Sequence, residues 1–242
     1  MTWALLPVKD LVQAKTRLSG VLAPHERRHL AQAMVEDVLS VLCEVRGLQG
    51  IQLLSDDPAA GLLAHKYQVE LMEESALGCS GLNPVIEAGV GLLAAREIDR
   101  VMVVHCDVPL VQVGDLEEFL SELNAPGVDL LLCPDLEGTG TNLMGFEVSH
   151  PPEFHYGPGS CQAHLASAQT LGQRARLWQN ARIGLDVDTP ADLLHLFHQL
   201  QTGARGKHTA DALLNSGIAQ RLSLMERAGL NPLGGMENHD AV

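Results

Sequence analysis

Short apolar runs alternate regularly with longer amphipathic segments along this 242-residue chain. The pattern begins with an apolar run over residues 3–8, an amphipathic stretch over 24–45 and a second apolar run over 51–54. Continuous apolar runs are typical of strands buried on both faces, as in parallel sheets covered by helices. The alternation therefore predicts an α/β fold with a Rossmann-like, three-layer architecture and a mostly parallel sheet.

The same pattern continues to about residue 200. It predicts further strands over 101–104, 128–132, 143–148 and 175–178, and further helices over 84–96, 115–123, 160–171 and 192–200. A glycine-containing joint at 203–206 precedes one more helical pattern. We therefore expect a main domain over residues 1–200 and, over 201–242, a C-terminal helical extension with a loose tail.

Composition limits the partners that the protein is expected to bind and the cellular compartment in which it is expected to lie. The formal net charge is −14, so the average surface repels a nucleic-acid backbone. The five cysteines form no CxxC pair, which favours a reduced, cytoplasmic protein. The apolar start is too short for a signal peptide or a membrane span, so we expect no membrane partner.

Against this acidic background, a basic island follows the first predicted strand. Lys9, Lys15 and Arg17 lie where open α/β sheets bind ligands, at the carboxyl end of a strand. Lysine and arginine side chains recognise phosphate groups, so this loop is predicted to bind a triphosphate; the alternative is an ordinary solvated loop. The loop contains neither a Walker sequence nor a dinucleotide glycine fingerprint.

Two later strand ends carry aspartates. Asp107 follows a buried strand and precedes a proline, where a carboxylate can hold Mg²⁺ or cap a helix. Asp188 precedes Thr189, which is predicted to cap a helix, and is therefore a candidate second metal ligand. Asp186 is expected to point to the opposite face if the strand persists, although the choice between Asp186 and Asp188 stays open.

Two glycine-rich loops suggest a second anionic ligand. One runs over residues 138–142 and contains Thr141; the other runs over 156–160 and contains Gly157 and Ser160. Such loops expose backbone N–H groups, and a helix beginning at Ser160 would direct its positive end toward an anion. Ordinary turns explain each glycine equally well.

Taken together, the motifs PVK…AKTRL, SDDP, GLN, CDVPL, PD…GTN, YGPGS and DVDTP resemble those of the CofC/FbiD guanylyltransferases of coenzyme F420 biosynthesis. The match spans residues 3–200. It implies a nucleotidyltransferase fold of the glycosyltransferase-A type. It also implies roles for Lys9, Lys15 and Arg17 at the GTP phosphates, Asp107 and Asp188 at Mg²⁺, Thr141, Gly157 and Ser160 at the acceptor, and Ser55 and Asn83 near the nucleotide.

The resemblance further implies that GMP passes from GTP to a phosphorylated three-carbon acid, with release of pyrophosphate. The acid is 2-phospho-L-lactate, phosphoenolpyruvate or 3-phospho-D-glycerate, and the product would pass to the next F420 enzyme. The pair His105-Cys106 and the extension beyond residue 200 depart from the family pattern, and the extension leaves the oligomeric state open, a homodimer included.

Three alternatives remain from the sequence. The first is a nucleotidyltransferase of the same fold with another base or acceptor, such as a cytidylyltransferase. The second is a non-catalytic GTP-binding sensor. The third, a nicotinamide dehydrogenase, is disfavoured because the glycine fingerprint is missing.

Overall fold

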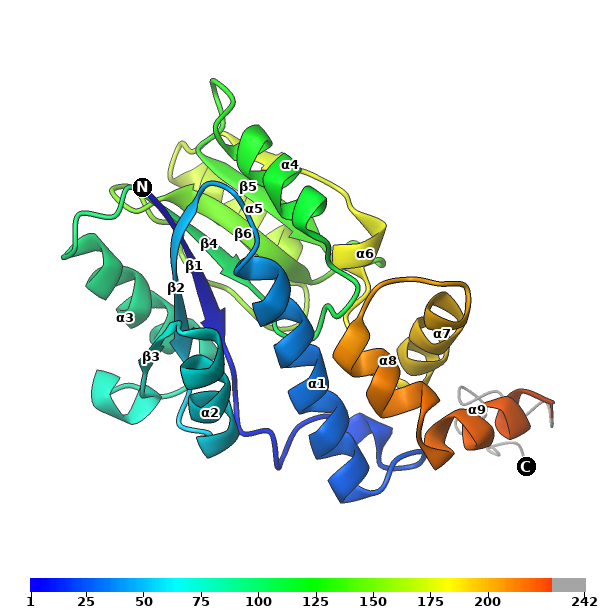
Figure 1. Ribbon diagram of the computed structural model, residues 1–242. Helices are drawn as coiled ribbons and strands as arrows, with labels where there is room; N and C mark the ends of the chain where they lie inside the picture. Colours follow the sequence, from blue (N-terminus) through cyan, green and yellow to red (C-terminus); the bar gives the residue numbers. More distant parts are fainter. Residues whose placement is uncertain (228–242) are drawn as a thin grey trace, which may run out of the picture.

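A seven-stranded sheet forms the centre of the molecule (Figure 1). The structure is a computed structural model and describes residues 1–227. The strand order is β3-β2-β1-β4-β6-β5-β7, and every pairing is parallel except those of β6 with β4 and β5. The strands are β1 (Thr2–Pro7), β2 (Leu48–Leu54), β3 (Glu70–Met72), β4 (Arg100–Val104), β5 (Leu130–Pro134), β6 (Thr141–Glu147) and β7 (Ala175–Leu177).

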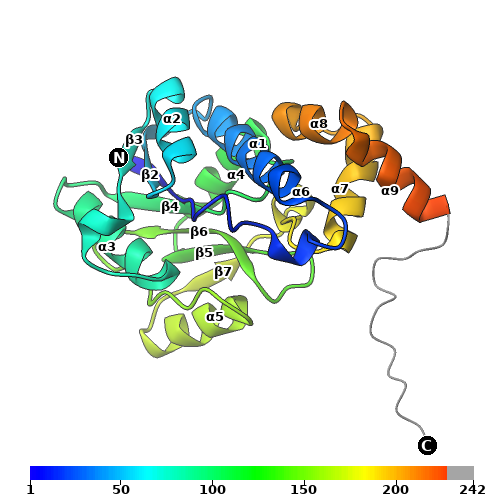
Figure 2. The same cartoon turned by 90° about the horizontal axis from the view of Figure 1, so that it is seen from below.

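Helices cover both faces of the sheet, which gives three layers (Figure 2). They are α1 (Pro24–Leu42), α2 (Pro58–Tyr67), α3 (Leu82–Ala94), α4 (Val113–Leu123), α5 (Ser160–Thr170), α6 (Ala181–Gly184), α7 (Pro190–Gln201), α8 (Lys207–Leu214) and α9 (Gly217–Arg227). Short 3₁₀ turns lie at Thr16–Leu18 and Glu74–Leu77. Within the described residues, none of the helices combines the length and the hydropathy needed to cross a membrane.

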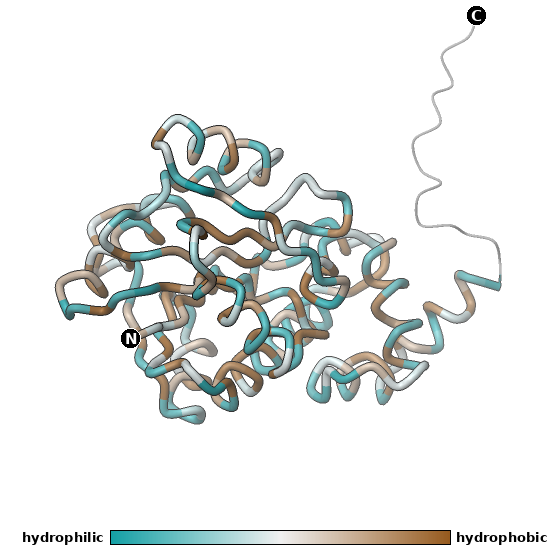
Figure 3. The backbone as a smooth tube through the Cα atoms, turned by 90° about the horizontal axis from the view of Figure 1, so that it is seen from above, coloured by the Kyte–Doolittle hydropathy of each residue, from teal (hydrophilic) through white to brown (hydrophobic). Residues whose placement is uncertain are grey.

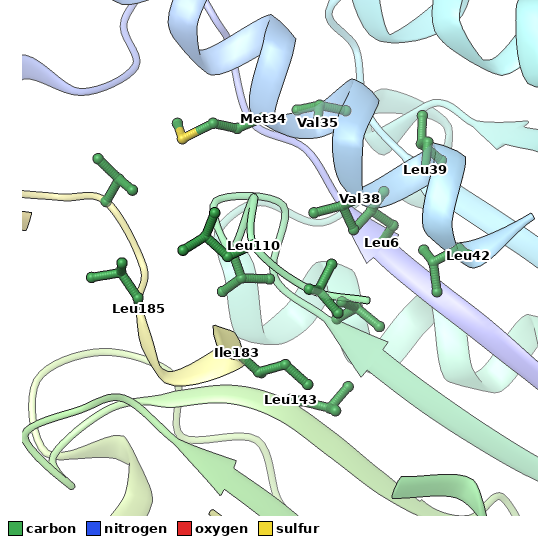
Figure 4. Close-up of a cluster of buried hydrophobic side chains, with 14 of the residues drawn as sticks. Leu6, Met34, Val35, Val38, Leu39, Leu42, Leu110, Leu143, Ile183 and Leu185 are labelled. Atoms are coloured by element: carbon green, nitrogen blue, oxygen red, sulfur yellow. The ribbon is translucent and has the colours of Figure 1, made fainter. Parts of the chain in front are cut away.

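Alternation along the strands divides the apolar side chains between two core layers. On β1, Leu6 packs in the layer beneath α1, whereas Leu5 belongs to the layer beneath α3. Figure 4 shows Leu6 beside Val38 of α1. The hydropathy-coloured backbone in Figure 3 is brown along the central strands and more mixed along the covering helices. The chain is thus a mostly parallel, three-layer α/β protein, as predicted.

Two features of the sheet escaped the sequence pattern. Helix α2 and the edge strand β3 lie between two predicted elements, and β3 has only three residues, of which two are exposed. Strand β6 was predicted, but its antiparallel direction was not. This direction matters for function because it brings the first residue of β6, Thr141, to the edge where the parallel strands β1 and β4 end.

The C-terminal helices pack on the main body. Helix α8 lies against α1, and α9 contacts α8. The buried Asp37 of α1 accepts hydrogen bonds from the backbone N–H groups of His208 (2.9 Å) and Thr209 (2.8 Å), at the start of α8. A domain boundary near residue 200 stays a prediction, and the tail predicted to be loose lies largely beyond residue 227, outside the described residues.

Candidate active site

A cavity of about 750 Å³ opens at the carboxyl ends of β1 and β4. This volume is within the range typical of small-molecule sites. Most of its lining comes from five segments of the chain: the loop after β1, the residues after β4, the start of β6, the turn before α5 and the segment before α7. The predicted site residues in the lining are Lys9, Lys15, Arg17, Asp107, Thr141, Gly157, Ser160 and Asp188.

Lys15 joins the two predicted metal-binding aspartates. Its Nζ donates to Asp107 Oδ2 at 2.7 Å and to Asp188 Oδ1 at 2.8 Å. The Lys15 side chain is only 9% exposed, so this ion pair has little access to water. The other oxygen of Asp107, Oδ1, is buried and has no hydrogen-bond partner among the described residues.

Electrostatics keep this cluster charged. Burial disfavours the ammonium of Lys15, but the adjacent carboxylates of Asp107 and Asp188 outweigh that effect and raise the pKa of Lys15. Burial likewise disfavours the charged form of Asp107, yet the Lys15 ammonium prevails and lowers the pKa of Asp107. Both partners therefore remain ionised at neutral pH.

The loop that carries Lys15 is held in a specific shape. Lys15 has φ 54° and ψ 40°, a left-handed conformation that costs about 1–3 kcal/mol for a residue with a side chain. The backbone N–H of Leu11 donates to Asp57 Oδ2 at 2.7 Å, which ties the loop to the start of α2. The strained residue is also the one that bridges the two aspartates, as expected where a site imposes the backbone geometry.

Asp186 lies in the same cavity as Asp188. It was expected to point to the opposite face only if the strand persisted, and this condition is not met. The reason is local: no strand extends through residues 185–189, and the strict alternation of side chains does not apply there. Asp186 Oδ1 accepts from Asn142 Nδ2 at 3.0 Å. Burial, aided by the charge of Asp107, raises the pKa of Asp186 to about 6.

Hydroxyl groups and glycines form the other side of the cavity. Thr141 and Ser160 are each 2% exposed, and Ser160 Oγ lies 3.4 Å from Thr141 Oγ1. Gly157 (φ 138°) and Gly159 (φ 74°) adopt conformations that a side chain would strain. They turn the chain so that α5 begins at the cavity, which directs the positive end of the helix dipole toward a bound anion.

Lys9 and Arg17 are the solvent-accessible cations of the basic loop. Both residues are exposed and line the cavity. Arg17 Nη1 lies 4.0 Å from Asp188 Oδ2, and the Arg17 side chain is 73% exposed. These side chains have the freedom to reposition around a phosphate group, whereas Lys15 is fixed.

The remaining two predicted site residues do not line the cavity. Ser55 is buried, and its Oγ accepts from the backbone N–H of Asp57 at 3.0 Å. Asn83 binds the backbone of Tyr156 twice: Oδ1 accepts from its N–H at 2.7 Å, and Nδ2 donates to its carbonyl at 3.1 Å. Both residues hold site-forming segments, and their predicted proximity to the nucleotide stays a prediction.

Sequence reasoning assigned no role to three residues that organise the site. Asp135 accepts from the backbone N–H groups of Thr139 and Gly140, both at 2.7 Å, which shapes the loop before Thr141. Asn142 holds Asp186, and His164 contacts Thr141 from behind. The spacing of Asp135 before a glycine loop is a readable turn signal. Nothing in the local sequence indicates that His164, on a helix, faces Thr141.

Comparison with known families supports the nucleotide-transfer interpretation. Residues 2–223 match the model of a family described as "Guanylyl transferase CofC like". A phosphoenolpyruvate guanylyltransferase of Conexibacter woesei is 32% identical over 217 residues, which cover 88% of this chain and 95% of that protein. A 2-phospho-L-lactate guanylyltransferase of Methanothermobacter thermautotrophicus is 31% identical over 192 residues, covering 79% and 82%.

Solved structures agree on the fold. A Desulfovibrio desulfuricans protein described as a nucleotide-diphospho-sugar transferase superimposes with a TM-score of 0.75 at 17% identity, covering 94% of this chain and 97% of that one. A cytidylyltransferase of Leptospira borgpetersenii gives a TM-score of 0.57 at 12% identity, covering 98% and 99%. At these identities the comparison speaks for the fold alone, which is that of nucleotidyltransferases.

Proposed function

The chain belongs to the CofC-like guanylyl transferase family and is a nucleotidyltransferase, and we propose that it transfers GMP from GTP to the phosphate of a phosphorylated three-carbon acid. One observation carries this proposal: a single cavity combines a basic loop and paired aspartates on one side with hydroxyl groups and a helix N-terminus on the other. Such a cavity suits two anionic substrates that must meet.

The reaction requires alignment more than proton transfer. An ionised phosphate oxygen of the acceptor attacks the α-phosphorus of GTP, a new P–O bond forms, and the bond to the β-phosphate oxygen breaks to release pyrophosphate. No general base is needed because the nucleophile is already deprotonated at neutral pH. Lys9, Lys15 and Arg17 would bind the phosphates and stabilise the charge that develops on the leaving group.

The aspartates fit a magnesium site. Asp107 Oδ2 and Asp188 Oδ1 converge on one cation, the Lys15 ammonium, and the orphaned Asp107 Oδ1 has capacity for a further partner. Mg²⁺ prefers one or two carboxylates with phosphate oxygens and water, so Asp107 and Asp188 would hold it, with Asp186 beside them. When bound, the metal would neutralise phosphate charge.

For the acceptor we propose 2-phospho-L-lactate, phosphoenolpyruvate or 3-phospho-D-glycerate, held by Thr141, Gly157 and Ser160. The names of the relatives support the first two acids. We further propose a place in coenzyme F420 biosynthesis, with hand-off to the enzyme that consumes the product. Mass spectrometry of reactions with each acid, and with GTP or CTP as the donor, identifies the product. Failure to form any guanylylated acid would refute the proposed activity.

Replacing Asp107 with asparagine tests the metal-site assignment. Asp107→Asn removes one ligand charge at nearly constant volume, so GTP-dependent pyrophosphate release should be lost while the fold persists. Asp211→Asn, on the exposed surface of α8, is the matched control and should retain activity. Wild-type turnover by the Asp107 variant would contradict the assignment.

A further inference from the structure

A histidine lies directly behind the hydroxyl side of the cavity. His164 belongs to α5, is 0% exposed and does not line the cavity. Each nitrogen of its ring has one hydrogen-bond partner: the backbone N–H of His155 at Nε2 and the hydroxyl of Thr141 at Nδ1. The proposed reaction assigns it no role.

These contacts determine which ring nitrogen carries the proton. The backbone N–H of His155 lies 2.9 Å from His164 Nε2, and because an N–H group only donates, Nε2 must accept. Burial lowers the pKa of His164 to about 4, so the ring is neutral at physiological pH. Its single proton therefore lies on Nδ1, which donates to Thr141 Oγ1 across 3.0 Å.

Counting hydroxyl protons shows the consequence. Thr141 and Ser160 each carry one hydroxyl proton, and the 3.4 Å contact between the two oxygens uses one of them. Because His164 donates its own proton to Thr141, the second hydroxyl proton remains available to the cavity. With the proton on Nε2 instead, Nδ1 would accept from Thr141, and both hydroxyl protons would be consumed inside the protein.

We propose that His164 is a positioning residue that makes the Thr141–Ser160 pair a net hydrogen-bond donor toward an anionic oxygen of the acceptor. The inference rests on the proposed function, which places the acceptor against these hydroxyls. An anionic oxygen offers only lone pairs, so a pair without a free proton would present lone pairs to it and repel it. The backbone of His155 sets the tautomer, and the tautomer sets the polarity of the subsite.

Two substitutions at His164 test the hydrogen bonds of the two ring nitrogens separately. In His164→Asn the amide nitrogen takes approximately the place of Nδ1 and keeps a donor for Thr141. In His164→Gln the amide reaches the place of Nε2 and keeps an acceptor for His155. Thr141 Oγ1 then loses its donor, so the Thr141 hydroxyl is no longer oriented and can turn its proton away from the cavity. His29→Gln, on the exposed face of α1, is the control.

We expect His164→Gln to raise KM for the phosphorylated acid about 10-fold, the effect of one charge-assisted hydrogen bond, with KM for GTP unchanged. His164→Asn should stay close to the wild type and the control. Equal acceptor KM values for the two His164 variants, or equal increases in KM for both substrates, would overturn the inference. Failure of the wild type on every acid would instead refute the proposed function.

Nuclear magnetic resonance tests the tautomer in the wild-type protein, and the variants serve only to assign the signals. Long-range ¹H–¹⁵N correlation spectra of the uniformly labelled protein distinguish a protonated from an unprotonated ring nitrogen. The His164 signals are assigned by their disappearance in whichever of the two variants folds. The expected spectrum shows a protonated Nδ1 and a bare Nε2 at neutral pH. A proton on Nε2 would overturn the inference, whatever the kinetics.

Discussion

Lys15 holds together two aspartates that are 92 and 173 residues away in the sequence. Its position in the first loop and its charge predicted an anion-binding role, and Asp107 and Asp188 were predicted from their places at strand ends. The ion pairs of Lys15 with the two aspartates could not be predicted from the sequence, because they depend on the strand order and on the left-handed backbone at Lys15.

Replacement of Lys15 by methionine tests its part in catalysis. Lys15→Met removes a fixed cation from the reacting phosphates, so kcat should fall by roughly 10²–10³-fold, the usual loss for one preorganised charge or donor. Pyrophosphate release under saturating substrates measures the effect. Lys207→Met, an exposed lysine at the start of α8, should behave as the wild type. A fall of similar size in the Lys207 variant, or none in the Lys15 variant, contradicts the assignment.

His164 also predicts how stability depends on pH. Its pKa is about 4 in the folded chain, against an ordinary value of 6.5 in the unfolded chain. Between these pH values the unfolded chain binds more protons, so stability falls as the pH decreases from 6.5 to 4, by up to about 3 kcal/mol. Urea denaturation across this interval should show a steeper loss for the wild type than for His164→Gln. Parallel curves would contradict a neutral buried ring.

At the scale of elements, the sequence predicted the strands that are buried on both faces. It missed an exposed edge strand and the direction of one strand. Strands β1 and β4 are continuous apolar runs because helices cover them on both faces, and their positions were predicted closely. Edge strand β3 is largely exposed, so no apolar run marks it. The direction of β6 depends on its neighbours rather than on its own residues, and so the approach of Thr141 to Asp107 was not predictable.

Helix α3 contains two glycines, and replacing each with alanine is expected to change stability in opposite directions. A Cβ on Gly89 would lie 2.9 Å from Leu54 Cδ1 and 3.3 Å from Leu5 Cδ1, whereas Gly91 is exposed with nothing within 4 Å. Gly89→Ala should destabilise the protein by about 1–3 kcal/mol through overpacking. Gly91→Ala should stabilise it by about 0.5–1 kcal/mol through helix propensity.

Urea denaturation of the two variants and the wild type compares these free energies directly. The variants share one helix and one added methyl group, so the difference between them isolates the packing of α3 against β1 and β2. Equal free energies of unfolding in the two variants would show that α3 does not pack as closely on the sheet as the contacts with Leu5 and Leu54 require.

On the scale of the whole molecule, an acidic chain contains a basic loop because three cations, Lys9, Lys15 and Arg17, are gathered after β1. The net charge of −14 includes the two aspartates that Lys15 bridges, of whose two negative charges it balances one. Composition alone predicted that nucleic acid is not a partner, which stays a prediction. It said nothing about a local anion site, which only the clustering of Lys9, Lys15 and Arg17 indicated. The same holds for the C-terminal extension, whose helical pattern was predicted but whose contacts were not.

Removal of α8 and α9 tests whether residues 1–200 form an independent domain. Leu213, Ile218 and Leu222 are buried in the layer that also contains α1, and Asp37 accepts the first N–H groups of α8. A chain ending at Gln201 exposes the surface that these three side chains cover and leaves the Asp37 carboxylate without those donors. At about 1.5–3 kcal/mol for each side chain, the loss should reach roughly 5 kcal/mol.

The reference for this experiment is a chain ending at Arg227, which keeps both helices. Relative to it, the shorter chain should melt at least about 10 °C lower, at roughly 2–4 °C for each kcal/mol in a protein of this size. Differential scanning calorimetry measures both transitions. Equal melting temperatures would establish residues 1–200 as the folding unit and reduce α8 and α9 to an appendage. The hydrogen bonds of Asp37 argue for the opposite result. The buried carboxylate of Asp37, on α1, accepts from the first N–H groups of α8, so its burial is compensated only while α8 is docked on α1.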